Sequence, residues 1–109
     1  MSALLAVLMV FCGGNVSVSA TAGSRIQQIY GTLQYTYAFE VVDLVNQERA
    51  REGLQPLTMD TELLEAAMQR SAEILVHFAH VRPDGSSCFS ISDKAFGENI
   101  AYGYGTPEQ

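Results

Sequence analysis

Two side chains, those of His80 and Glu98, are the best candidates for a functional site in this chain of 109 residues. His80 follows a long amphipathic segment, and Glu98 lies between Gly97 and Asn99 in the motif GENIA. A neutral imidazole and a carboxylate brought together can bind a divalent metal ion or act in general acid–base chemistry. The residues alone leave two plainer interpretations open: a histidine at the end of a helix that caps it or lies on the surface, and a glutamate that anchors a loop by hydrogen bonds.

The other reactive side chains are less suited to chemistry. His77 has i, i+3 spacing to His80, but it lies at the edge of an apolar helix stripe and is interpreted as a boundary residue. Cys88 is expected to be an ordinary loop thiol, because a nucleophilic cysteine needs a histidine base within hydrogen-bond reach. Arg82 and Asp84 are expected to stabilise a turn, with substrate binding by Arg82 as the alternative. No phosphate-binding loop, nucleophile elbow or zinc-protease helix motif is present in the sequence.

Two amphipathic helices must position these residues. The first is predicted over 39–52 and ends at Gly53, which suits a left-handed helix cap. The second is predicted over 60–78, with Asp60 as N-cap and Glu62 in its first turn. Glu73 is expected to lie outside its apolar stripe. That stripe comprises Leu63, Leu64, Ala67, Met68, Ser71, Ile74, Leu75 and Phe78.

Shorter elements are predicted after the second helix. Arg82-Pro83-Asp84-Gly85 is typical of a turn, and 97–102 is expected to form a short strand. Thr106-Pro107-Glu108-Gln109 has the composition of a helix start, with Thr106 as N-cap and Gln109 at the third helical position. We therefore expect a helix from 107 that is incomplete, and a chain that is a fragment of a domain.

The ordered set of LVNQER, GL-PL, the second helix, H-x-RPDG and GENIA resembles the CAP superfamily of cysteine-rich secretory, antigen 5 and pathogenesis-related proteins, in its bacterial secreted form. The resemblance covers 39–109 and implies the N-terminal half of a CAP domain. The implied fold class is α+β, a CAP-type α–β–α sandwich, here truncated to two main helices, short strands and an incomplete third helix. CAP domains have a cleft with two histidines and two acidic residues that binds zinc or other divalent ions in several members. His80 and Glu98 match one histidine and one acidic residue of that cleft.

The resemblance implies an extracellular binding module with a latent divalent-metal or ligand cleft, and an enzyme is not the favoured interpretation. The alternatives are a metal-assisted extracellular hydrolase, with Glu98 as base and His80 as ligand, and a structural cell-envelope domain with a vestigial cleft. Two protein ligands leave most of a zinc coordination sphere to water, so weak or absent zinc binding is expected for this chain. The expected partner is an extracellular small molecule, a lipid or a cell-envelope component.

Composition and the N-terminus bear on location. The 12 acidic and 6 basic residues give a formal charge of −6 and no basic patch, so a nucleic-acid partner is not expected. Residues 1–20 have the apolar run and the small residues Val18-Ser19-Ala20 of a signal peptide, which predicts secretion to the extracellular space. The run is too short for a stable transmembrane anchor. Residues 21–38 are interpreted as a linker or N-terminal arm, and 39–109 as a partial CAP domain.

Overall fold

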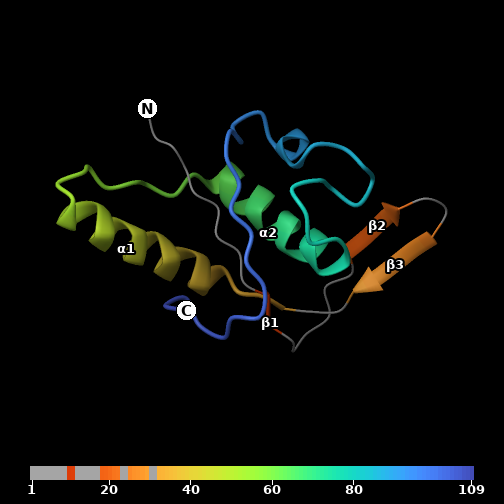
Figure 1. Cartoon of the computed structure of the whole chain (residues 1–109), viewed down its shortest axis with the longest axis horizontal. Coiled ribbons are helices and arrows are strands. Elements are labelled where there is room, and N and C mark those ends of the chain that lie inside the picture. Colours follow the sequence, from red (N-terminus) through yellow and green to blue (C-terminus); the bar gives the residue numbers. More distant parts are fainter. Residues whose placement is uncertain (1–9, 12–17, 23–24, 30–31) are drawn as a thin grey trace.

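The computed structural model describes residues 10–11, 18–22, 25–29 and 32–109. In chain order its elements are β1 (Val10–Phe11), β2 (Val18–Ala22), β3 (Arg25–Ile29), β4 (Thr32–Leu33), α1 (Tyr35–Arg51), α2 (Thr61–Val76) and a short 3-10 helix, η1 (Cys88–Ile91). Figure 1 shows α2 near the middle, with the hairpin of β2 and β3 beyond one of its ends. No helix in these ranges is both long and apolar enough to cross a membrane.

The strands form two separate antiparallel pairs. β2 pairs with β3 from Val18 opposite Ile29 to Ala22 opposite Arg25, and β1 pairs with β4. Both β3 and β4 fall within 21–38, the segment predicted to be a linker, and α1 begins at Tyr35 rather than at 39. Most of the predicted signal peptide lies outside the described residues, so the leader stays a prediction.

α1 ends where the sequence predicts. Gly53 has a φ of +70°, which a residue with a Cβ adopts only at a cost. The amide of Gly53 donates to Ala50 and the amide of Leu54 donates to Arg49, the two hydrogen bonds of a Schellman cap. The following connection is tied back to α1, because the Asn46 side chain bonds both backbone groups of Leu57, at 2.9 and 2.7 Å.

α2 supplies the core of the described structure. Asp60 caps it as predicted, since its Oδ1 accepts hydrogen bonds from the amides of Glu62 and Leu63. The buried cluster consists of Leu64, Ala67, Met68 and Ile74, and it is packed against by Leu33, Ala38, Met59 and Ile100. The predicted stripe is therefore confirmed in its central part.

Two expectations about α2 are wrong. Phe78 is 55% exposed because the helix ends at Val76, so the last residue of the predicted stripe no longer lies on a helical face. Glu73 is buried rather than outside the core, because two arginines surround its carboxylate.

The predicted strand over 97–102 is absent: this segment is extended but has no β-partner among the described residues. It is held instead by side chains. Ile100 packs on the α2 core, and the ring of Tyr102 lies 6.3 Å from that of Phe78. The earlier part of the loop is fixed to the start of α2, where Lys94 pairs with Asp60 and Glu62.

The segment at 106–109 forms a turn rather than the helix expected from 107. One contact of the predicted helix start is nevertheless present, because the side-chain oxygen of Gln109 accepts a hydrogen bond from the Thr106 amide at 3.1 Å. The described residues thus form two main helices with little strand, and the α–β–α sandwich expected from the resemblance is not confirmed.

Candidate functional site

A tight loop after α2 brings His80 and Cys88 opposite each other. Gly85 donates to the carbonyl of Arg82 and has a φ of +87°, and Asp84 accepts a hydrogen bond from the Ser86 amide. Val81 and Ser87 form an antiparallel bridge across this turn. In antiparallel register the residues one step outside a bridged pair face each other. The sequence RPDG therefore places an imidazole across from a thiol.

Glu98 reaches the same place from the extended segment of the chain. Its Oε2 lies 2.8 Å from Nδ1 of His80. Its other main contact is with Arg70 of α2, which donates from Nε to Oε1 at 2.5 Å and from a terminal nitrogen to Oε2 at 3.3 Å. A guanidinium that bonds both oxygens of a carboxylate fixes the plane of that carboxylate as well as its position.

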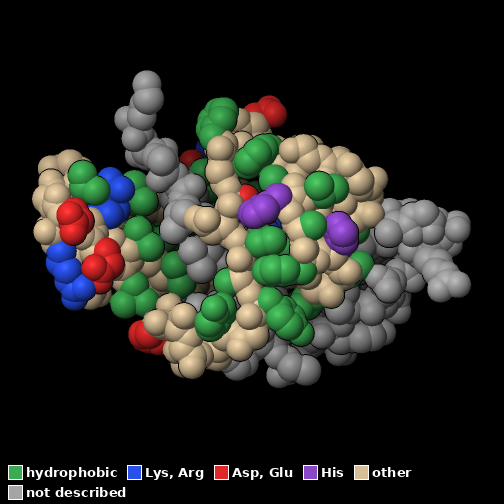
Figure 2. All heavy atoms as spheres, viewed as in Figure 1, with side chains coloured by type: hydrophobic (Ala, Val, Ile, Leu, Met, Phe, Trp, Pro, Cys, Tyr) green, Lys and Arg blue, Asp and Glu red, His purple; other side chains and the backbone are tan. Residues whose placement is uncertain are grey.

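Three potential metal ligands meet here: a ring nitrogen of His80, Sγ of Cys88 and a carboxylate oxygen of Glu98 all lie within 4.8 Å of one another. The thiol and carboxylate are buried, whereas the side chain of His80 is 60% exposed. We call these three residues the His80–Cys88–Glu98 cluster. Figure 2 shows both histidines of the chain on one face of the molecule, where hydrophobic side chains also gather.

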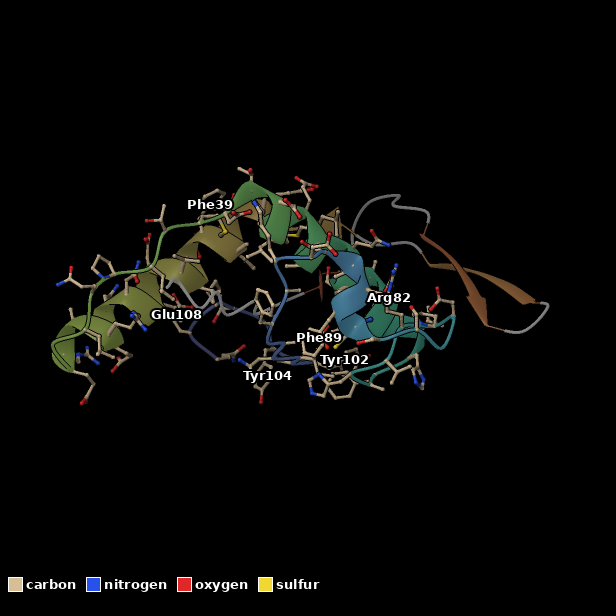
Figure 3. The ribbon with its side chains drawn as sticks, turned by 90° about the horizontal axis from the view of Figure 1, so that it is seen from above. Phe39, Arg82, Phe89, Tyr102, Tyr104 and Glu108 are labelled. Carbon is tan, nitrogen blue, oxygen red and sulfur yellow. The ribbon has the colours of Figure 1, made fainter. Side chains whose placement is uncertain are left out.

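Behind the cluster lies a buried ion-pair network. Arg70 donates to Glu73 at 2.9 Å and to the carbonyl of Ala79 at 2.9 Å, so all its nitrogens have partners. Glu73 also accepts hydrogen bonds from Arg82, the shortest at 2.6 Å. Figure 3 shows Arg82 beside the ribbon of α2, the helix that carries Glu73. Two arginines and two carboxylates therefore balance in charge.

These contacts change the ionisation of the buried groups. Burial favours the neutral form of Glu98, but the hydrogen bonds from Arg70 and His80 outweigh it and lower its pKa. The pKa of Glu73 is lowered in the same way, because bonds from Arg82, Arg70 and Gln69 offset its burial. The pKa of the Cys88 thiol is raised, first by burial and then by the charge of Glu98. Without a cation in the cluster, Cys88 is thus a protonated and unreactive thiol.

A small pocket of about 30 Å³ adjoins the cluster on its inner side, where Cys88 and Glu98 contribute to its wall. The rest of the wall is largely apolar and comes from α2 and from the loop of 89–100. This volume exceeds the roughly 10–15 Å³ that one water molecule needs. The pocket next to the cluster therefore has room for at least one water or a small ligand group.

The structure brings together His80 and Glu98, the two residues predicted as metal ligands. His77, the C-cap of α2, is exposed and is not in the cluster.

Sequence reasoning missed Cys88 and Arg70. The signal for Cys88 was its position, since a turn centred on 84 pairs 80 with 88. The burial of Arg70 could have been suspected, because this residue lies on α2 next to the apolar stripe. Arg82, for which substrate binding was considered, is committed to Glu73.

Comparison with known proteins identifies a relative and a family for this chain. The chain is 40% identical over 81 residues to the uncharacterized protein YkwD of Bacillus subtilis (strain 168), an alignment that includes 67% of this chain and 32% of that protein. The chain thus spans about a third of the length of this relative. No solved structure matches the chain significantly. The sequence pattern of the Cysteine-rich secretory protein family (CAP) matches residues 42–109, which include the second part of α1, all of α2 and the whole cluster. The chain therefore belongs to the cysteine-rich secretory protein family.

Proposed function

We propose that this protein is an extracellular binding module whose cleft holds a divalent metal ion at His80 and Glu98. The observation that carries this proposal is their convergence: two residues 18 positions apart lie 2.8 Å from each other, with the imidazole exposed and the carboxylate buried. An imidazole nitrogen and a carboxylate oxygen are donors that zinc and similar ions accept. When bound, the ion would supply a positive charge for an anionic or polar ligand group.

The residues around the pair fit a binding role better than hydrolysis. Both oxygens of Glu98 are engaged by Arg70, and one also contacts His80. The hydrogen bonds from Arg70 and His80 outweigh burial and lower the pKa of Glu98, and a carboxylate with a lowered pKa is a weak general base. Arg70 instead holds Glu98 as a charged, oriented ligand, so we place the metal-assisted hydrolase second. A structural envelope domain with a vestigial cleft is the outcome if no ion binds.

The rest of the proposal concerns fold, location and partner. We infer that the complete domain is an α–β–α sandwich and that the protein is secreted, supported by its membership of the secretory protein family and by the leader-like residues 1–20. The partner would be an extracellular small molecule, a lipid or a cell-envelope component. A second hollow of about 400 Å³ beside α2, whose lining includes Leu33 and Met68, has the volume that organic ligands require.

Zinc titration of two single-histidine variants tests the metal site. His80→Ala removes a proposed metal ligand and should weaken zinc binding at least about tenfold in isothermal titration. Loss of a residue that only supports a metal ligand already costs about 10–100-fold in affinity. His77→Ala is the matched control, because His77 is also exposed but lies outside the cluster. Equal affinity in both variants, or no binding by the unchanged chain, would contradict the proposed site. Mass spectrometry of secreted protein tests the location, with Thr21 or a near neighbour expected as the first residue.

A further inference from the structure

Cys88 occupies a place in the cluster that its expected role as an ordinary loop thiol does not explain. Its sulfur lies within 4.8 Å of the donor atoms of His80 and Glu98, and the side chain is only 4% exposed. The loop that carries it is built to hold it there. Val81 pairs with Ser87, and the Ser87 hydroxyl accepts a hydrogen bond from the amide of Phe89 at the start of η1.

Charge balance gives the thiol a role in binding a cation. The charge of Glu98 is already matched by Arg70, and that of Glu73 is matched by Arg70 and Arg82. A divalent ion added to this partly buried place brings two further positive charges, and an uncompensated charge is costly away from water. His80 is neutral when it binds a metal ion, so it supplies no compensation. Among the described members of the cluster, Cys88 can supply an additional negative charge, as a thiolate.

The donor types also restrict the metal ion. One nitrogen, one sulfur and one oxygen donor match the three protein ligands of a zinc site that keeps a fourth position open for water or a ligand. Thiolate sulfur favours zinc and comparable transition metals, whereas calcium and magnesium bind almost entirely to oxygen. The three donor atoms are spread over up to 4.8 Å, which is wider than the distance of roughly 3.5 Å between ligand atoms around a bound zinc ion. His80 is exposed, so a change of its rotamer can bring its ring nitrogen closer to the other two donors.

We propose that the thiolate of Cys88 is the third protein ligand of the metal site, together with His80 and Glu98, and that the site selects zinc-like ions over calcium and magnesium. This inference rests on the proposed metal-binding function and deepens it. The thiol loses its proton to the buffer as the sulfur–metal bond forms, so one proton is released for each ion bound. The third ligand also raises the expected affinity above that of the two-ligand site predicted from the sequence.

Cobalt titration of the reduced chain is the decisive experiment, because a cobalt–thiolate bond produces a strong charge-transfer absorption in the near ultraviolet. The chain of 109 residues, tested with its predicted leader in place, has two cysteines, Cys12 and Cys88, so each serves as the control of the other. The absorption should appear in the unchanged chain and in Cys12→Ser, and it should be absent from Cys88→Ser. Zinc should bind Cys88→Ser at least about tenfold more weakly than it binds Cys12→Ser. A large excess of calcium or magnesium should leave the cobalt spectrum unchanged.

The outcomes separate this inference from the function on which it rests. Cobalt binding that depends on His80 but gives no charge-transfer absorption would overturn the role of Cys88 and leave the two-residue site in place. Absence of cobalt and zinc binding in the unchanged chain would overturn both. If Cys88→Ser does not fold, Cys12→Ser still decides, because Cys88 is then its remaining thiol: absorption in this variant supports the inference, and its absence refutes it.

Discussion

Replacing Arg70 by methionine tests whether the buried ion-pair network holds the fold together. The Arg70 side chain is 4% exposed and donates to Glu98, Glu73 and the carbonyl of Ala79. Methionine has a similar length but removes the charge and all the donors. It leaves the carboxylate of Glu98, 8% exposed, with the exposed His80 as its main partner. Glu73 is less affected, because Arg82 still contacts it.

The expected loss is large compared with the stability that is available. Removal of one partner from a buried ion pair costs about 3–5 kcal/mol. A single core of about 70 residues rarely supplies more than this amount of free energy of unfolding. We therefore expect Arg70→Met to be largely unfolded in buffer, with a weakened helical circular dichroism signal and no cooperative urea transition.

The matched control is Arg51→Met on α1. Arg51 pairs with Glu48, but both side chains are 68% exposed, and exposed pairs contribute at most about 1 kcal/mol. This variant should unfold at nearly the same urea concentration as the unchanged chain. Glu98→Gln added to Arg70→Met should restore part of the lost stability, because it removes the unpaired buried charge. The reasoning is refuted if Arg70→Met and Arg51→Met have free energies of unfolding within about 1 kcal/mol of each other.

Three further predictions concern stability. Ile74→Ala, at a buried position of the core cluster, should cost about 2–5 kcal/mol, and Val76→Ala, at a half-buried position, much less; equal losses in urea melts would contradict this. Asn46→Ala removes both hydrogen bonds to Leu57, so it should cost about 1–3 kcal/mol and speed hydrogen exchange of the Leu57 amide. Because the pKa of Glu73 is lowered in the fold, its contribution is complete above its ordinary value of 4.5 and is lost as the pH falls through the lower folded value. Compared with the unchanged chain, Glu73→Gln should therefore lose less stability as the pH falls from about 5 to more acidic values, as measured by urea melts at several pH values. A pH profile identical to that of the unchanged chain would refute this assignment.

The end of α1 and the start of α2 could be predicted from the sequence because their causes are local. Asp60 caps α2 through amides two and three residues away, and Gly53 ends α1 through bonds to its last turn. The strand over 97–102 could not be predicted in this way. A strand exists only when another segment pairs with it, and in the described residues this segment is held by side chains instead. Composition alone does not distinguish these two ways of holding an extended chain.

The candidate site could be predicted only in part, because some of its contacts depend on segments that are distant in the sequence. His80 and Glu98 were identified by their chemistry, supported by the family resemblance, and the structure brings them to 2.8 Å. The roles of Arg70 and Glu73 depend on which face of α2 the rest of the chain covers. A charged pair at i, i+3 is usually exposed, and its burial here follows from Glu98 and Arg82 arriving from later in the chain. Periodicity cannot show that a polar pair is buried when its partners lie outside the helix.

Glu98 belongs to both the network and the proposed metal site, and this shared position gives a last prediction. An ion that binds only the folded chain stabilises it by about 2.7 kcal/mol when its concentration is 100 times the dissociation constant. In Arg70→Met the ion also compensates the unpaired charge of Glu98, so zinc should stabilise this variant more than it stabilises the unchanged chain. The helical circular dichroism signal of Arg70→Met with and without zinc, together with urea melts of the unchanged chain, measures the difference, with His80→Ala as the control that should gain little. If zinc restores no helical signal to Arg70→Met while binding the unchanged chain, the ion is not bound through Glu98. The network and the metal site would then be independent of each other.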